Sequence, residues 1–454
     1  MDSILDFVGI LNDRIVWGLP MVLLMIGTGI FLTWVTGGVL FRRFSVVLGC
    51  TVKTLFRPSD PSGKEQGGIS PFGAVCTALA ATVGTGNIVG VALAIATGGP
   101  GAIFWLWISA LVGMVIKYSE VTLAQAYRTT NRAGRIVGGP MYYISGGMGR
   151  PGLATLFATL GALAALGIGA SVQANTLAGG IHDALGFSNG QIGIVTAVLG
   201  GLIFLGGIRR ITAVTVWLVP WMSILYIGGA LLVLLRNVDL IPGAFALILR
   251  GAASGNAAIG GFLGATALRA CRVGMARGVF THEAGMGSAP IAHASATSDH
   301  PARQGLWGAF EVFFDSIVMC TLTALVILIC GLWYDPTLAA DPRTMSAMAF
   351  ENAFPGGRYI VTLGMSLFAF ATIIAWYYYG ETCIEYLAKG RRHIQTGYRL
   401  VYILMIYWGC VAGIEAVWEF ADLFNGLMAI PNLMALLALW PTIRQLTLDF
   451  FSNK

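Results

Sequence analysis

Small and polar residues cluster in an otherwise apolar stretch, TALAATVGTGNIVGVALA, between positions 77 and 94. The residues at its centre are Thr82, Gly84, Thr85, Gly86 and Asn87. Glycine costs a helix about 1 kcal/mol relative to alanine, so this composition favours a break in the helix. Carbonyl groups freed at a break can bind a cation, and amides at the start of the next half-helix can bind a carboxylate. The segment has the groups for both.

Unpaired backbone groups inside a lipid bilayer are costly, so a break must line a polar cavity or be covered by protein. We expect Thr82, Thr85 and Asn87 to contact a ligand at the break. The alternative is that they only cap the broken helix ends, as threonine and asparagine often do. For the glycines, the alternative is close helix packing through the spacing of Gly86 and Gly90.

A second interrupted segment, ARGVFTHEAGMGSAPIAHA at positions 276–294, has a Gly-x-Gly centre at Gly285 and Gly287. It falls in the seventh predicted span, and the first break falls in the second span. The two segments therefore cross the membrane in opposite directions. Paired breaks at matching positions of two five-helix halves are typical of inverted-repeat transporters with a site near mid-membrane.

Ionisable residues accompany the second break and the third span, and such residues inside a membrane are functional hypotheses by default. Glu283 is expected to pair with Arg277 or Lys117 and brace the break, with a proton-carrying role as the alternative. His282 is a candidate proton site. Lys117 and Glu120, at positions i and i+3, are expected to form an ion pair.

Two later spans carry pairs of polar or aromatic side chains on one helical face. In the fourth span, Gln173 and Thr176 share a face. Gln173 can donate and accept hydrogen bonds, which suits a zwitterion, although an interhelical hydrogen bond is the alternative. In the ninth span, Thr372 offers a hydroxyl for sodium, and Trp376 would close a pocket for a small apolar side chain. A position in an interfacial aromatic belt is the alternative for Trp376.

Membrane helices must position these residues. Hydrophobic residues make up 56% of the 454-residue chain and charged residues 11%, whereas soluble proteins have about 25% charged residues. We expect one all-helical membrane domain over 1–454, in which 15–38 is an extra helix and 71–235 and 258–442 are two five-helix repeats. The eleven predicted spans are 15–38, 71–97, 101–127, 152–183, 189–207, 211–235, 258–297, 305–333, 357–388, 397–414 and 420–442.

Basic residues are divided unevenly between the two sets of loops, with 18 in one set and five in the other. Because basic residues are enriched on the cytoplasmic side, we expect the N-terminus outside and the C-terminus in the cytoplasm of a prokaryote's inner membrane. No basic cluster with interleaved aromatics points to nucleic acid. The seven cysteines have no spacing typical of a metal site or a disulfide framework.

Several long motifs resemble a known family. GGPGAIFWLWISALVGMVIKYSEVTLA, at positions 98–124, resembles the signature of the alanine or glycine:cation symporters, as do TALAATVGTGNIVGVA, VGGPMYYI, EAGMGSAPIAHA and WYYYGE. The match extends over about 10–445. It implies a leucine-transporter-like fold and sodium- or proton-coupled uptake of alanine or glycine. TVGTGN is similar to the AVGLGN at the break in the leucine transporter's first core helix, and the resemblance also points to Gln173.

These patterns predict sodium-coupled import of a small neutral amino acid, alanine or glycine, with no organic cofactor. The substrate carboxylate is expected at the amides of Thr85 to Asn87, and its ammonium at carbonyls near Val279 and Phe280. The residues expected to contact the substrate are Thr82, Thr85, Gly86, Asn87, Gln173, Thr176, Val279, Phe280 and Trp376.

Sodium is expected between carbonyls near Ala80 and Val83 and the hydroxyl of Thr372. In the wider fold, sodium-coupled proteins usually carry two adjacent hydroxyls on this helix, but Thr372 is flanked by Ala371 and Ile373. A further sodium ligand is therefore expected from elsewhere in the chain.

Other functions remain as alternatives. Proton coupling, or selectivity for glutamine or asparagine, is compatible with the same fold, because Gly179 and Gly180 could leave room for a longer side chain. A passive channel would need a continuous polar pore, and no second ring of acidic or carbonyl groups is visible. An intramembrane enzyme would need a nucleophile with a base, or a metal set, and the sequence has no such motif.

Overall fold

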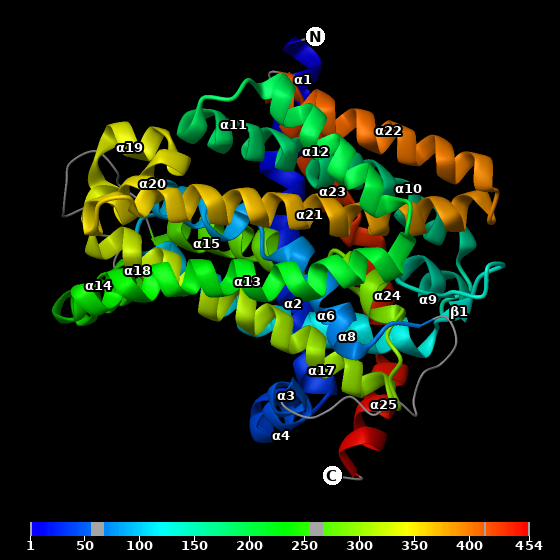
Figure 1. Ribbon diagram of the computed structural model, residues 1–454. Helices are drawn as coiled ribbons and strands as arrows, with labels where there is room; N and C mark the ends of the chain where they lie inside the picture. The colour runs from blue at the N-terminus through cyan, green and yellow to red at the C-terminus, as the bar shows by residue number, and fades with distance from the viewer. Residues whose placement is uncertain (1, 56–67, 254–266, 413–414, 453–454) are drawn as a thin grey trace.

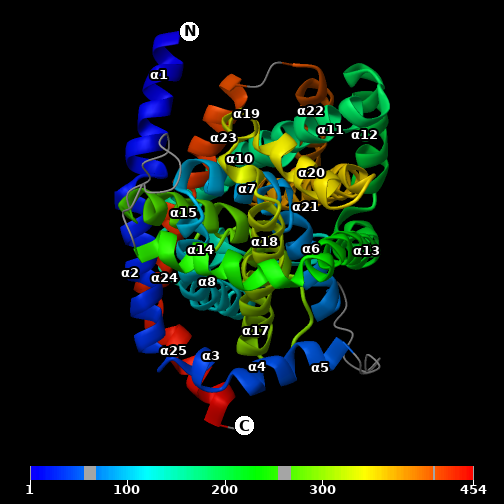
Figure 2. The same cartoon turned by 90° about the vertical axis from the view of Figure 1, so that its left-hand side faces the viewer.

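The computed structural model describes residues 2–55, 68–253, 267–412 and 415–452, which fold almost entirely into helices (Figures 1 and 2). Two short strands, β1 (Thr129–Thr130) and β2 (Ile136–Val137), pair antiparallel. In both views the N- and C-termini lie at opposite ends of the molecule.

The helical elements of the first half, where η marks a 3₁₀ or π turn, are α1 (Asp2–Leu11), η1 (Asn12–Val16), α2 (Leu19–Val35), α3 (Val39–Arg42), α4 (Phe44–Cys50), α5 (Val52–Leu55), α6 (Pro71–Thr82), η3 (Thr85–Asn87), α7 (Val89–Gly98), α8 (Gly101–Ala126), α9 (Pro140–Gly146), α10 (Pro151–Ala164), η4 (Ala165–Val172), α11 (Gln173–Leu185), α12 (Asn189–Phe204), α13 (Gly207–Arg236), η5 (Val238–Leu240) and α14 (Ile241–Ala253).

The helical elements of the second half are α15 (Ala267–His282), α16 (Ala289–Ala294), α17 (Pro301–Val312), η6 (Phe313–Cys320), α18 (Thr321–Ile329), η7 (Leu332–Tyr334), α19 (Pro336–Ala340), α20 (Pro342–Ala353), α21 (Gly357–Ala388), α22 (Arg392–Val411), α23 (Glu415–Leu427), α24 (Ala429–Ala438) and α25 (Trp440–Ser452).

Seven helices within the described ranges are long and apolar enough to cross a membrane. An eighth span is formed if α6 and the helical segment after it, bent by 58° at a short break, are counted together. The predicted all-helical membrane class is confirmed at this level. The first residues of the predicted second repeat, 258–266, lie outside the described residues.

The first predicted break is present. α6 ends at Thr82, η3 forms a single 3₁₀ turn, and α7 begins at Val89. Val83 and Gly84 lie between α6 and η3 in a non-helical conformation. The Gly84 amide donates to Oδ1 of Asn87 at 2.9 Å, so the asparagine caps the broken end. The capping role weighed for this residue is therefore confirmed.

The second predicted break is also present, because α15 ends at His282 and α16 begins only at Ala289. Glu283, Gly285 and Gly287 have φ angles of 52°, 92° and 81°. Glycine adopts this left-handed region without a steric cost, which explains the Gly-x-Gly spacing. Glu283 adopts it despite having a Cβ atom.

The two broken segments are joined at one end. Ile69, just before α6, forms a parallel bridge with Ala296, just after α16. The Ile69 amide donates to the Ser295 carbonyl at 2.9 Å, and the Thr297 amide donates to the Ile69 carbonyl at 2.9 Å. These bonds hold the start of the first broken segment beside the end of the second.

α21 passes through the middle of the molecule (Figure 1) and packs against α6, α10, α11 and α13. α8 packs against α15 and α17, and α2 lies against α8 along one side of the bundle (Figure 2). The first break contacts α15, η6 and α21 through η3. The second is hydrogen-bonded to Glu120 of α8 and to Trp376 of α21. Protein thus covers the irregular backbone at both breaks, as a lipid environment requires.

Three of the seven long apolar helices that the structure describes contain a π turn, and the first of these turns is η1 in Phe7–Val35. The helix Pro151–Leu185 includes η4, and the helix Pro301–Ile329 includes η6. Each of these two helices is continuous through its π turn. π turns often occur at functional sites.

Candidate functional site

A small cavity lies where both breaks face α21. Its lining includes seven of the predicted site residues: Thr82, Thr85, Gly86, Gln173, Phe280, Thr372 and Trp376. The cavity leaves about 20 Å³ for the centre of a water-sized sphere. One water needs about 10–15 Å³ by this measure, so the cavity has room for about one water. An amino acid would therefore fit only after the surrounding side chains move.

The first break contacts the fourth predicted span at the cavity. The Thr85 hydroxyl donates to Oε1 of Gln173 at 3.3 Å, and both side chains are buried. The two residues come from separate predicted spans, yet the structure brings them to the same polar contact. A zwitterion at this position would meet a hydroxyl and an amide together.

The η3 turn leaves its first amides unused within the turn. The Asn87 amide donates to the Gly84 carbonyl at 3.3 Å, and the Ile88 amide donates to the Thr85 carbonyl at 3.2 Å. The amides of Thr85 and Gly86 lie at the N-terminal end of the turn, where helical hydrogen bonding leaves donors without partners. Both residues line the cavity.

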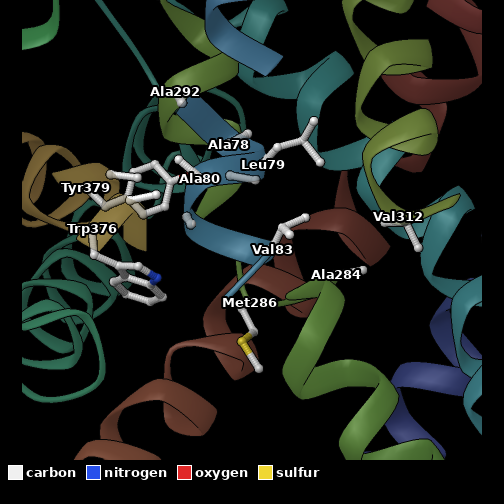
Figure 3. Close-up of a cluster of buried hydrophobic side chains, with 14 of the residues drawn as sticks. Ala78, Leu79, Ala80, Val83, Ala284, Met286, Ala292, Val312, Trp376 and Tyr379 are labelled. Carbon is white, nitrogen blue, oxygen red and sulfur yellow. The ribbon is translucent and has the colours of Figure 1, made fainter. Parts of the chain in front are cut away.

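Two of the three predicted sodium residues, Ala80 and Thr372, come into contact between α6 and α21. The Thr372 hydroxyl lies 3.0 Å from the Ala80 carbonyl and 3.0 Å from the Phe368 carbonyl. A Cβ on Gly84 would lie 3.0 Å from the same hydroxyl, so a side chain there would crowd it. Figure 3 shows Ala80 of α6, and Val83 just after that helix, beside the α21 residues Trp376 and Tyr379.

Three predicted substrate residues lie outside this cavity lining. Asn87 points its amide nitrogen at Asp315. The Thr176 hydroxyl donates to the Val172 carbonyl of its own helix at 3.0 Å. Val279 lines a separate cavity beside α2. Thr176 was predicted from helical spacing, Asn87 from its place in the break, and Val279 for its carbonyl; none of these arguments fixes the direction of a side chain.

Asp315 in η6 is a fully buried acidic residue that the sequence analysis missed. Its Oδ1 accepts from Nδ2 of Asn87 at 2.6 Å, and its Oδ2 accepts from the Ser316 hydroxyl at 2.8 Å. These bonds tie the first break to the α17–η6–α18 helix. The available signal was a single acidic residue inside an apolar run, FFDSIV.

Glu120, on α8, satisfies the second break. Its Oε1 accepts from the amides of Gly285 at 3.0 Å and Gly287 at 3.1 Å. The same oxygen accepts from Nδ2 of Asn432 at 2.5 Å. The backbone amides that could hold an external carboxylate at this break are therefore occupied by the protein's own carboxylate.

The ion pair predicted between Lys117 and Glu120 is wrong. Nζ of Lys117 lies 3.4 Å from Oε1 of Glu311 on α17, and Nε2 of His293 lies 3.0 Å from Oε2 of Glu311. Lys117, His293 and Glu311 are all fully buried. Spacing along one helix predicted the wrong partner, because Glu120 instead accepts hydrogen bonds from the second break.

The ion pair predicted for Glu283, with Arg277 or a lysine, is also wrong. Oε2 of Glu283 accepts from the Ser288 hydroxyl at 2.5 Å, and Oε1 accepts from Nε1 of Trp376 at 3.2 Å. Arg277 lies over the Phe280 ring instead. Trp376 is only 1% exposed, which excludes the interfacial belt.

His282 supports the end of α15. Its Nδ1 accepts from the Ala284 amide at 3.0 Å, so the ring proton of the neutral side chain is on Nε2. Nε2 lies 3.1 Å from the Ser109 hydroxyl. Both ring nitrogens therefore have partners in the protein, and His282 is absent from the lining of the cavity between the breaks.

A family model described as "Sodium:alanine symporter family" matches residues 1–454. The chain belongs to the sodium:alanine symporter family. It is therefore a transporter and not an enzyme. Its several apolar helices make it a multi-pass membrane protein.

Three relatives cover nearly the whole chain. The "Sodium/alanine symporter AgcS" of Methanococcus maripaludis is 43% identical over 442 residues, which are 96% of this chain and 95% of that protein. An "Uncharacterized transporter" of Haemophilus influenzae is 43% identical over 442 residues, 97% of this chain and 95% of that protein. The "Probable sodium/glutamine symporter GlnT" of Bacillus subtilis is 38% identical over 457 residues, 100% of this chain and 92% of that protein.

Proposed function

We propose that this protein carries alanine or glycine into the cell together with Na⁺. The observation that carries the proposal is the cavity between the two breaks, with seven of the predicted site residues in its lining. Broken helices facing each other at one cavity provide dipole ends and free backbone groups for a charged substrate and an ion. The name of the Methanococcus relative is consistent with this pairing of alanine and sodium.

The substrate carboxylate would bind at the amides of Thr85 and Gly86, which line the cavity and are unused within η3. The ammonium group would lie toward the end of α15 near Phe280, where the helix dipole is negative. Val279 suits this role less, because its carbonyl already accepts from the Glu283 amide at 2.9 Å.

Gln173 and Trp376 would hold the rest of the amino acid. Gln173 already bonds to Thr85, so its amide group would lie beside the substrate's polar end. Trp376 contributes an indole to the lining and would close over the methyl group of alanine. The cavity must enlarge to admit any amino acid, and a longer side chain would need more enlargement than glycine or alanine.

Sodium would bind between the Thr372 hydroxyl and carbonyls of the first break near Ala80 and Val83. Hard cations take oxygen ligands from hydroxyl and backbone carbonyl groups. The 3.0 Å separation of the Thr372 and Ala80 oxygens is short enough for both to ligate one ion. Sodium binding would then link α21 to α6.

The proposed architecture is a leucine-transporter-like 5+5 inverted repeat with eleven spans. Residues 15–38 form the extra helix, and 71–235 and 258–442 form the two repeats. The excess of basic residues in one set of loops supports an outside N-terminus and a cytoplasmic C-terminus in a prokaryotic inner membrane.

Glutamine transport is a second candidate, because the Bacillus relative carries a sodium/glutamine name. The geometry favours it less. A Cβ on Gly179 would lie 3.0 Å from Nη1 of Arg343, and a Cβ on Gly180 would lie 3.4 Å from Cε of Met365. The predicted space for a longer side chain at these glycines faces α20 and α21, away from the cavity lining.

Uptake into proteoliposomes tests the proposal. An inward Na⁺ gradient should drive concentrative uptake of radiolabelled alanine and glycine at constant pH, and unlabelled glutamine should compete weakly. Equal uptake with choline in place of Na⁺ would contradict sodium coupling, and stimulation by an imposed proton gradient would then favour H⁺. Strong competition by glutamine would favour the second candidate.

A further inference from the structure

Glu283 is the single charged residue in the cavity lining, as far as the described residues show. Its backbone lies in the second break, and its side chain is only 6% exposed. Oε1 receives the indole N–H of Trp376, which also lines the cavity, at 3.2 Å. One carboxylate is thus held against a cavity that otherwise has neutral walls.

The neighbouring ionisable residues are committed to other partners. Glu120 accepts three donors from the second break and Asn432. Both ring nitrogens of His282 face Ala284 and Ser109. Of the described acidic and basic residues near the second break, only Glu283 reaches the cavity lining.

The backbone at Glu283 is unfavourable for a residue with a side chain. Its φ angle of 52° is left-handed, and it directly follows the last residue of α15. Glycine commonly ends helices in this conformation, because other residues are strained there. A glutamate at a position that suits glycine indicates that the carboxylate itself has a role, as strained residues often do at functional sites.

The carboxylate has no cationic partner among the residues that the structure describes. Among the described residues, Glu283 forms no ion pair with lysine, arginine or histidine; the nearby Lys117 is paired with Glu311 at 3.4 Å. A buried charge is costly unless it is paired. Each oxygen of Glu283 accepts one protein donor, whereas a carboxylate offers about four acceptor positions in all. The Glu283 carboxylate can therefore accept further hydrogen bonds from a cationic group in the cavity.

We propose that Glu283 is the counter-charge for the α-ammonium group of the substrate. The inference rests on the proposed amino-acid transport. With the substrate carboxylate at the Thr85 and Gly86 amides, the ammonium would face the second break. Glu283 would then make the site select zwitterions over acids that have the same carboxylate and methyl group but no ammonium.

Competition binding tests this role. Purified protein in detergent binds radiolabelled alanine, and unlabelled alanine or lactate competes; lactate replaces the ammonium with a hydroxyl. In the parent, alanine should bind at least about 30-fold more tightly than lactate. Lactate lacks the ammonium group and so leaves the buried Glu283 carboxylate without its counter-charge, which is costly. Glu283→Gln should weaken alanine at least about 30-fold while leaving lactate within about threefold of its parent value. The preference for the zwitterion would be largely lost.

Ser288→Ala is the matched control, because it removes one hydrogen bond to Glu283 but keeps the charge; its alanine-to-lactate ratio should stay near that of the parent. Glu283→Asp keeps the charge one methylene further back and should reduce the ratio partly, which provides a second test if Glu283→Gln does not fold. Equal weakening of alanine and lactate in Glu283→Gln, or an unchanged ratio in Glu283→Asp, would overturn the proposal. Absence of alanine binding and of Na⁺-driven uptake in the parent would instead overturn the proposed function.

Discussion

At Gly86 the first break approaches the second, and this contact allows a sharp test of the site. A Cβ on Gly86 would lie 3.2 Å from Cγ2 of Thr281 and 3.6 Å from Cδ1 of Phe280. The first distance is tighter than an ordinary contact, so Thr281 would have to shift. Gly86 is not among the residues with positive φ, so the effect of a substitution there is steric.

Overpacking a fitted site costs about 1–3 kcal/mol, which corresponds to about a 5- to 150-fold loss of affinity at 1.4 kcal/mol per factor of ten. We expect Gly86→Ala to raise the Kd of alanine within that range. Gly86→Val adds two further methyl groups and should abolish measurable binding. Both proteins should still fold, because the shift falls on the walls of the cavity.

Equilibrium binding of radiolabelled alanine to purified protein measures this effect, with size-exclusion chromatography and thermal unfolding to verify the fold. Gly90→Ala is the control: its Cβ would lie 3.9 Å from Cγ2 of Thr281, an ordinary contact, and its Kd should stay within about twofold of the parent. The reasoning is refuted if Gly86→Val binds alanine like the parent. Equal damage in Gly90→Ala with folding intact would mean that the glycines serve helix packing.

Three further predictions follow from contacts around the breaks. Thr372→Ala should raise the Na⁺ concentration for half-maximal uptake about 5- to 10-fold, because it removes a hydroxyl 3.0 Å from the Ala80 carbonyl; Thr372→Ser should stay near the parent, and loss of folded protein in both would indicate a packing role. Glu283→Gly should be more stable to thermal unfolding than Glu283→Ala by about 1–2 kcal/mol, because glycine adopts the left-handed backbone without the steric cost of a Cβ atom; equal stability would argue against that conformation. Lys117→Met should destabilise the protein by about 3–5 kcal/mol, because it leaves Glu311 buried without its cation. In unfolding experiments, adding Glu311→Gln should restore part of this loss. Additive losses from the two substitutions would show that the pair is uncoupled.

The two breaks could be predicted from sequence because the signal is local. Glycine at Gly84 and Gly86, and at Gly285 and Gly287, is disfavoured in a helix wherever it occurs. The bent helix at the first break and the left-handed glycines at the second follow from residue type. The contact between Thr85 and Gln173 was predictable only at the level of a shared site, because no local rule pairs residues from different spans.

The tertiary partners of buried charges could not be predicted in the same way. The spacing of Lys117 and Glu120 describes one helix, whereas their partners come from α17 and from the second break. Asp315 was missed because its role depends on Asn87 in a distant segment. A buried charge is satisfied by whichever group the fold brings near, and helical periodicity carries no information on that choice.

The π turns η4 and η6 have a consequence for how the walls of the cavity can change. η4 contains Ile168 and ends directly before Gln173, and both residues line the cavity; η6 contains Asp315, which holds Asn87. A π turn contains one surplus residue relative to an α-helix. If that surplus moved along the helix by one turn, each residue it passed would rotate by about 100° and shift by about 1.5 Å along the axis. Gln173 could thereby leave or re-enter the cavity while its helix stays hydrogen-bonded throughout. The cavity lining would then change by a shift of helical register and not by unwinding of the helix.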